Sequence, residues 1–259
     1  IFYREHCGER PLRMKAKFKR VPAIDKCFTI LELLVRSKKP MGISDISNAL
    51  KYNKSTVFNI VYTLNDLCIL ENGRHNEFRP GTQLYVLGKA ASLGSQLIRT
   101  VHPYLEEINQ RTKLSAFLGI RSGLRAIIVD KVDSAFDIKI SSEIGMKLPL
   151  LAGAGGKALL SQLSDTEIEK ILSQNKLNRF TRHSCVNKQK YKEMIERTRQ
   201  AGIALDREEY IEGICAFAVP LNINRTDSQA AIWAVGLKRQ VSDGVTGRYS
   251  RFLKEIAQK

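Results

Sequence analysis

The sequence contains few cysteines, and their spacing excludes the usual structural uses of this residue. The five are widely scattered: Cys7, Cys27, Cys68, Cys185 and Cys215. Their number is odd and no pair forms Cys-x-x-Cys, which argues against a disulfide framework or a zinc knuckle. We therefore expect a protein of a reducing compartment whose cysteines are small buried hydrophobes. Neither a metal nor a cofactor is expected.

Long apolar runs are also lacking. The longest, such as residues 230–237, are far too short to span a bilayer. The chain does not open with a charged stretch, an apolar segment and a cleavage site, so a secretory signal is not expected. These absences predict a cytoplasmic protein with no membrane partner. Met14 is a candidate natural start, with residues 1–13 as upstream read-through.

Acidic residues are scarce relative to basic ones. There are 42 Lys and Arg against 26 Asp and Glu, which gives a formal net charge of +16 and favours a polyanionic partner. Residues 1–100 hold 17 basic against 8 acidic residues, so the N-terminal part is the denser positive surface. Charge alone does not distinguish DNA, RNA and a membrane surface. The 259 residues, 43% of them hydrophobic, suffice for two modest domains.

Apolar periodicity predicts three helices and a hairpin in the N-terminal part. The first helix starts at Ala23 and ends before Pro40, the second covers a short stretch before residue 51, and the third runs over residues 54–67. A polar turn between two short apolar stretches predicts a hairpin over residues 69–79. The predicted domains are a basic flexible tail (1–21), a winged helix-turn-helix (22–81), a linker helix (82–98) and a second domain (99–259).

The second and third helices are joined by only three residues, 51–53, which is the spacing of a helix-turn-helix. Ser44 and Asn53 stand where N-caps of these two helices are expected. The second helix can brace the third, whose exposed face then fits the major groove of DNA.

The outward face of the third helix has the residue types that such contacts need. Asn59 can pair with adenine through two hydrogen bonds, and Lys54 lies at the positive end of the helix, where phosphate binds well. The candidate DNA-binding residues are Ser44, Lys54, Ser55, Thr56, Asn59, Tyr62, Arg74 and Arg79. The alternative interpretation is an ordinary three-helix bundle with a solvated polar face.

The C-terminal half alternates between the two kinds of element without a strict repeat, which predicts an α+β domain. Strands are expected over residues 116–120, 125–132, 136–140, 214–221 and 230–237. Helices are expected over residues 155–162, 165–172, 191–201 and 247–257. Before them, residues 82–111 are expected to be helical, with an interruption near His102 and Pro103.

The N-terminal motifs resemble the DNA-binding domain of the IclR family of bacterial regulators. The resemblance rests on residues 43–50 (ISDISNAL), residues 53–57 (NKSTV) and residues 62–64 (YTL), and it continues from the wing at residues 78–81 into the linker helix. Pro80 is a departure, because an apolar residue is usual there. The resemblance implies a homodimer, with tetramers as a further possibility, on a pseudo-palindromic double-stranded DNA operator.

The resemblance extends to the C-terminal half through residues 148–150, 152–160 and 206–213, with Pro220 seven residues later. It implies a GAF-like α+β domain that holds a small-molecule effector, a carboxylate or an aromatic compound. The candidate effector-binding residues are Gly153, Ala154, Gly155, Asp206, Glu212, Cys215, Trp233 and Val235. Asp206 and Glu212 are equally well interpreted as solvated loop residues, and Trp233 as a core residue.

Two departures from the family bear on the effector. Trp233 and Val235 stand where relatives often carry serines, and Cys215 lies one residue before the usual cysteine position, here Ala216. The loss of two hydroxyls favours an aromatic or bulkier apolar effector over a small polar acid.

The glycines of residues 153–156 also support a ligand site on physical grounds. They let backbone amides approach a ligand, and they open a helix whose N-terminus attracts anions. Such turns commonly serve packing only. The segment is not a nucleotide P-loop, because Leu151 and Ala158 replace a required glycine and Ser/Thr.

Two other functions compete with ligand-controlled, sequence-specific regulation. One is a thiol redox enzyme of GAF-like fold with Cys215 as nucleophile, although no other catalytic residue is indicated and we expect no enzyme. The other is a sequence-independent nucleic-acid binder, which fits the basicity but leaves the C-terminal domain without a role.

Overall fold

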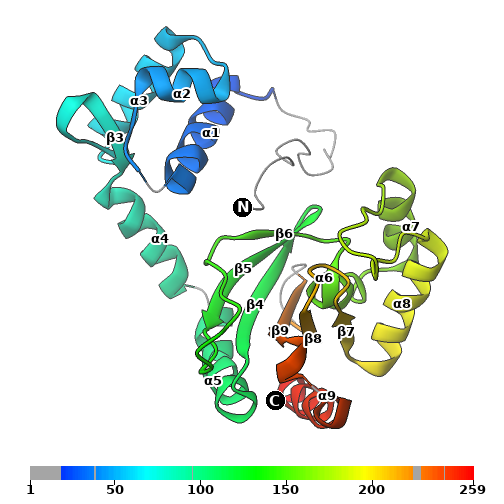
Figure 1. Ribbon diagram of the computed structural model, residues 1–259. Coiled ribbons are helices and arrows are strands. Elements are labelled where there is room, and N and C mark those ends of the chain that lie inside the picture. Colours follow the sequence, from blue (N-terminus) through cyan, green and yellow to red (C-terminus); the bar gives the residue numbers. More distant parts are fainter. Residues whose placement is uncertain (1–18, 38, 95, 224–228, 242) are drawn as a thin grey trace. The chain divides into compact units, whose positions relative to one another are not determined.

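The computed structural model describes residues 19–37, 39–94, 96–223, 229–241 and 243–259. They divide into two compact units, one that ends at Gln96 and one that runs from Leu97 to Lys259 (Figure 1). Residues 1–18 of the predicted tail therefore lie outside the described part of the chain.

The N-terminal unit is a winged helix-turn-helix, as predicted. Its elements are α1 (Pro22–Ser37), β1 (Met41–Gly42), α2 (Ile43–Leu50), α3 (Lys54–Asp66), β2 (Leu70–Asn72), the 3-10 turn η1 (Arg74–Asn76), β3 (Glu77–Pro80) and α4 (Thr82–Gly94). Strand β3 pairs with both β1 and β2 in an antiparallel sheet. One apolar core joins the three helices and the wing: Ile30, Leu34, Ile46, Val57, Val61, Leu64, Leu70 and Phe78.

The connection between α2 and α3 is as tight as predicted, but the cap of α2 is not at the predicted residue. Helix α2 starts at Ile43 with Gly42 as its N-cap, so Ser44 lies inside the first turn. The Asp45 carboxylate accepts a hydrogen bond from the Gly42 amide and satisfies the helix start in place of a serine cap. Lys51 closes α2 in the left-handed conformation, with φ of 54°.

The C-terminal unit is built on a six-stranded antiparallel sheet with the order β6-β5-β4-β9-β8-β7. The strands are β4 (Ser115–Ser122), β5 (Arg125–Val132), β6 (Lys147–Pro149), β7 (Ala204–Arg207), β8 (Ile214–Leu221) and β9 (Ala230–Leu237). The helices are α5 (Gln96–Thr112), α6 (Gly153–Leu160), α7 (Asp165–Gln174), α8 (Lys188–Ala201) and α9 (Asp243–Gln258), with the 3-10 turn η2 (Lys238–Gln240). The predicted α+β class is confirmed.

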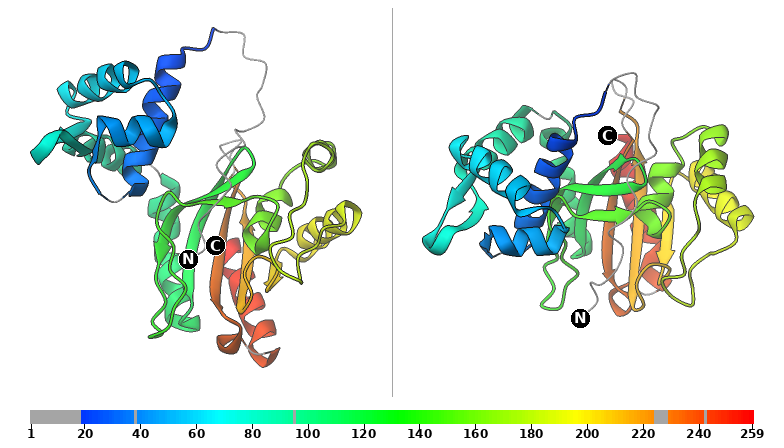
Figure 2. Two further views of the ribbon diagram at one scale, coloured as in Figure 1. Left: turned by 45° about the horizontal axis from the view of Figure 1, so that its top comes forward. Right: turned by 90° about the horizontal axis from the view of Figure 1, so that it is seen from above.

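The sheet separates two apolar cores. Helices α6, α7 and α8 cover one face, and α5 and α9 cover the other (Figure 2). Successive residues of a strand point to opposite faces, so Ala216 and Ala218 of β8 lie in the α6 core while Cys215, Phe217 and Val219 lie in the α5/α9 core.

The prediction of a strand over residues 136–140 is wrong. The alternating apolar residues fit a strand, but the segment pairs with none of the described strands, and β4 is flanked by β5 and β9. Instead, side chains bind the segment: the Ser115 hydroxyl donates to the Ile140 carbonyl and the Gln240 amide donates to the Ile138 carbonyl.

The predicted interruption near His102 and Pro103 is also wrong, because α5 continues through Pro103. Two strands of the C-terminal unit were not predicted: β6, which pairs with β5, and β7, which forms the opposite edge of the sheet. Both have only three or four residues, too few to show a period.

Helix α6 approaches the preceding loop closely at Gly156. A Cβ placed there would lie 2.0 Å from the Leu150 carbonyl oxygen, which is backbone and cannot rotate away. The glycine therefore sets how near α6 lies to this loop.

We predict that Gly156→Ala destabilises the C-terminal unit by about 2 kcal/mol, because the added methyl forces the backbone apart. Gly247→Ala on α9 is the matched control: nothing lies within 4 Å of its Cβ, and alanine favours a helix interior. Urea unfolding followed by circular dichroism measures both. Equal midpoints for the two variants would contradict the close-packing argument.

Candidate nucleic-acid interface and effector site

Helix α3 has one buried and one exposed side. Val57, Val61 and Leu64 are buried against α1, α2 and the wing, while Ser55 and Asn59 are exposed. This division places the predicted reading residues at the surface and not in the core. Both side chains can therefore form hydrogen bonds with a partner such as DNA, whose major groove is wide enough to admit a helix.

Aromatic packing constrains the far end of that face. The half-buried Tyr62 ring lies 4.4 Å from the ring of Phe58 and 5.5 Å, edge to face, from that of Phe78 on the wing. Phe58 is 49% exposed and was not predicted as a site residue. The sequence could have indicated Phe58 as a candidate DNA contact, because it lies beside the polar stripe of α3. A large exposed apolar residue on a recognition helix can contact a thymine methyl.

The start of α3 has the features of a phosphate site. Lys54 is its first residue and is exposed, and the Asn53 side chain stands at the N-cap without making a capping hydrogen bond. The helix N-terminus thus keeps amides directed outward beside a positive charge. Thr56, half-buried, lies in the same first turn, and Ser44 is exposed in the first turn of α2.

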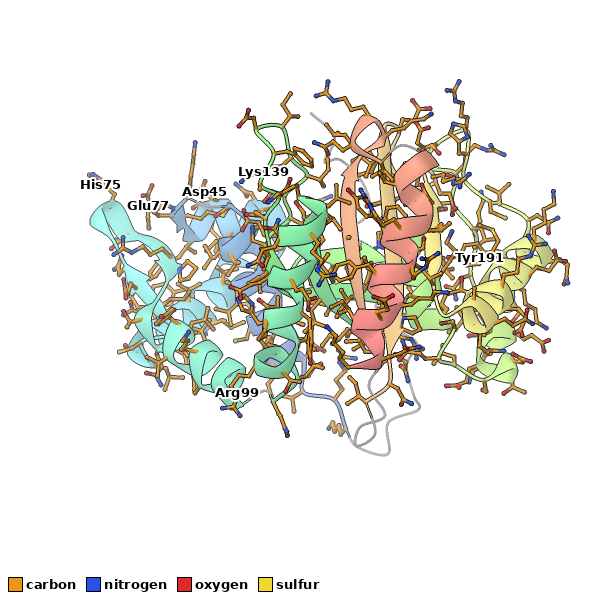
Figure 3. The ribbon with its side chains drawn as sticks, turned by 90° about the horizontal axis from the view of Figure 1, so that it is seen from below. Asp45, His75, Glu77, Arg99, Lys139 and Tyr191 are labelled. Carbon is orange, nitrogen blue, oxygen red and sulfur yellow. The ribbon has the colours of Figure 1, made fainter. Side chains whose placement is uncertain are left out.

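On the wing, Arg79 forms an ion pair with Glu71 of the neighbouring strand. Its guanidinium lies 3.1 Å from the Glu71 carboxylate, which also accepts hydrogen bonds from the Thr82 hydroxyl and amide at the start of α4. These bonds from Thr82 and Arg79 lower the pKa of Glu71. His75 lies at the tip of the wing (Figure 3), and the side chain of Arg74 lies outside the described residues.

The C-terminal unit brings most predicted effector residues to one place, on the face of the sheet that α6 covers. Asp206 and Val235 both pair with Ala216 across the sheet and share its face, and Trp233 pairs with Ala218. Gly153, Ala154 and Gly155 begin the helix above them. Gly153 adopts φ of +67°, a conformation that side chains other than glycine rarely take.

Asp206 is a buried carboxylate at the start of α6. Its Oδ2 would lie 3.0 Å from a Cβ at Gly153, and its Oδ1 accepts a hydrogen bond of 2.6 Å from the Glu209 amide. Burial raises the pKa of Asp206 to about 6, against the opposing effect of that bond and of the Lys157 ammonium. The group therefore changes charge near neutral pH.

A buried lysine ties α6 to the loop after β7. The Lys157 ammonium donates to both carboxylate oxygens of Glu209, at 2.7 and 2.8 Å, and to the Leu205 carbonyl at 2.6 Å. These three bonds use its three donors. Tyr191 of α8 (Figure 3) is buried nearby, and among the described residues its hydroxyl has no hydrogen-bond partner. Sequence reasoning missed these residues, because their partners are distant along the chain.

Cys215 and Glu212 do not join this cluster. Cys215 lies on the opposite face of the sheet, in the core formed with α5 and α9, and burial raises the pKa of its thiol. A raised pKa disfavours the thiolate that a redox nucleophile needs. Glu212 is exposed and lies 3.8 Å from the Arg182 guanidinium.

Among the described residues, no group of His, Cys, Asp and Glu side chains is arranged to hold a metal ion. In the same part of the chain, no helix combines the length and the apolarity that a membrane span requires.

Comparison with known proteins identifies both units. Residues 23–72 match the IclR helix-turn-helix domain and residues 90–259 match the bacterial transcriptional regulator IclR C-terminal domain. The chain is similar to the HTH-type transcriptional regulator KdgR of Dickeya chrysanthemi, with 29% identity over 78% of this chain and 66% of that protein. It is also similar to XynR of Escherichia coli, with 25% identity over 91% of this chain and 94% of the relative.

Solved structures share the fold. An IclR-type regulator from Alicyclobacillus acidocaldarius superimposes with a TM-score of 0.83 at 22% identity, covering 92% of this chain and 97% of the other. An IclR homologue from Microbacterium hydrocarbonoxydans, solved as a complex with 4-hydroxybenzoate, gives 0.78 at 21% identity over 91% and 96%. Since both domain matches occur in order and the second alone covers more than half of the sequence, the chain belongs to the IclR family of bacterial transcriptional regulators.

Proposed function

We propose that the protein regulates transcription by inserting α3 into the major groove of a specific DNA site. One observation carries this proposal: the polar stripe of α3 with Ser55 and Asn59 is exposed, while α2 and the core hold the apolar stripe fixed. A helix held in this way can present the same side chains to successive base pairs.

The exposed residues divide into two roles. Asn59 in the middle of the helix, with Ser55 beside it, would read base edges. Lys54, Ser44 and Thr56 near helix starts would bind phosphates and fix the register of the protein on DNA. Tyr62, with its ring packed, would reach DNA through its hydroxyl. Arg74 and Arg79 of the wing are proposed to contact the DNA backbone. Arg79 would then leave the Glu71 carboxylate and bind a phosphate.

The active form would be a homodimer. Helix α1 exposes an apolar stripe of Ile24, Phe28 and Val35, and α4 exposes Tyr85, Val86 and Leu87. Exposed apolar residues gathered on two helices of one small unit favour a protein partner. A symmetric pair would bind a pseudo-palindromic double-stranded operator. The tetramer implied by the family resemblance remains a prediction.

The C-terminal unit would hold a small-molecule effector, a carboxylate or an aromatic metabolite, that modulates operator binding. Support comes from the convergence of Gly153 to Gly155, Asp206, Trp233 and Val235 at the start of α6, and from the similar fold of the regulator solved with 4-hydroxybenzoate. Cys215 and Glu212 lie elsewhere and are not included. An effector can act only by binding one arrangement of the regulator better than another. A DNA partner also implies a cytoplasmic protein.

We predict different losses for two substitutions on α3. Asn59→Ala should reduce discrimination between operator and random DNA by about 1–3 kcal/mol, because base-reading bonds are lost. Lys54→Ala should weaken both complexes alike and reduce the salt slope by about one, because only a phosphate contact is lost. Fluorescence anisotropy on a duplex selected from random DNA by the wild type, against a scrambled duplex, measures both.

Two results of that titration would count against the proposal. If Asn59→Ala keeps the full preference for the selected duplex, the reading role of Asn59 is wrong. If the wild type itself binds both duplexes equally at fixed salt, the protein is a sequence-independent binder.

We predict that the stability of the Asp206→Asn variant, relative to wild type, rises with pH. The folded state raises the pKa of Asp206 from 3.8 to about 6, so the native protein binds more protons than the unfolded chain between these values. Wild-type stability is therefore lost as pH rises through this window, by about 2–3 kcal/mol in full. Asparagine stays neutral and avoids the loss.

Thermal unfolding at pH 4 and pH 7.5 tests this prediction. The melting temperature of Asp206→Asn minus that of wild type should be larger at pH 7.5. The matched control is Asp137→Asn, at an exposed loop residue. Its melting temperature minus that of wild type should be the same at both pH values. A difference for Asp206→Asn that is largest at pH 4 would show that the carboxylate is stabilising when ionised.

A further inference from the structure

The indole of Trp233 fills the space between α6 and the sheet. Trp233 stands in the middle of β9 and is only 3% exposed. On the neighbouring strand β4, a Cβ at Gly119 would lie 1.9 Å from its Cη2 atom. On the helix, a Cβ at Gly155 would lie 3.1 Å from its Cε3 atom. The ring is thus in contact with backbone on both sides.

This space is the one around which the candidate effector residues gather. Trp233 shares a sheet face with Val235 and Asp206, and Gly155, which touches the ring, follows Gly153 and Ala154 in α6. Phe117 closes a further side, with its ring centroid 6.4 Å from that of the indole. A protein interior this closely packed has no room for a second ring beside the first.

We propose that Trp233 determines the specificity of the effector site by occupying the volume that an aromatic ligand would need. The inference rests on the proposed effector function of this unit and narrows it. The wild-type site excludes aromatic acids by overlap with the indole and takes a ligand without a ring, held by polar groups at the start of α6. The geometry thus reverses the preference for an aromatic effector that the loss of two serines suggested. Exclusion by a bulky side chain is a common source of specificity.

The experiment compares wild type with Trp233→Ala, using indole and 4-hydroxybenzoate as probes. Removal of the ring should leave an apolar cavity that an aromatic molecule can fill. We expect calorimetry to show binding of indole to the variant at least tenfold tighter than to wild type, with a higher melting temperature. Indole should also change the affinity of the variant for its selected duplex by threefold or more.

The matched control is Phe217→Ala. Phe217 is an equally buried aromatic residue, 2% exposed, on the opposite face of the same sheet. Its removal also creates a cavity, but one away from Asp206 and α6. Indole should therefore stabilise this variant without changing its DNA affinity, which separates an effector site from simple refilling of a core.

Several outcomes would overturn the inference. One is binding of 4-hydroxybenzoate to wild type with a change in the emission of Trp233, which is the single tryptophan of the chain and reports directly on its surroundings. Another is a folded Trp233→Ala variant that binds neither probe, or one whose DNA affinity responds to indole no more than that of Phe217→Ala. If Trp233→Ala does not fold, Trp233→Phe and the wild-type titration decide. Loss of specific DNA binding by wild type itself would instead refute the proposed function.

Discussion

The burial of one apolar stripe of α3 is the constraint on which the DNA-binding unit depends. Val57, Val61 and Leu64 can leave water only by packing against α1, α2 and the wing. Because a helix has two sides, this packing forces Ser55 and Asn59 outward. The three-residue turn and the left-handed Lys51 then fix the angle at which that face is presented. The exposure of this polar face is therefore a consequence of core formation and needs no separate folding element.

Strong periodicity made the larger elements predictable, and its absence explains the errors. The strands over residues 214–221 and 230–237 have the predicted bounds, because each is a continuous apolar run of eight residues. The segment 136–140 has the pattern of a strand but pairs with none of the described strands, and side chains of Ser115 and Gln240 bind its carbonyls instead. Pro103 does not end α5, although proline removes a helical hydrogen bond, because Val101, Leu105 and Ile108 anchor the helix in the core.

The arrangement of the candidate effector residues could not be derived from the sequence, because it depends on strand register and on partners distant in sequence. A shift of one residue along β8 moves a side chain through the sheet, so Cys215 and Ala216 belong to different cores. The bonds from Lys157 to Glu209 join residues that only the folded chain brings together. Glu212 stands in the same motif but is exposed beside Arg182, whereas the acid that binds Lys157 of α6 is Glu209, three residues earlier.

The packing of Trp233 shows that a side chain and the glycines around it form one unit. The indole fits only because Gly119 and Gly155 leave space on two separate elements, and a methyl at Gly119 would overlap the ring. A smaller residue at position 233 alone would leave an apolar cavity, and larger residues at the glycines alone would clash. In an interior without spare volume, a ring that belongs to the protein and a ring that belongs to a ligand are mutually exclusive occupants. If the proposed effector binds at the start of α6, the contacts that hold Trp233 between this helix and the sheet also limit its size.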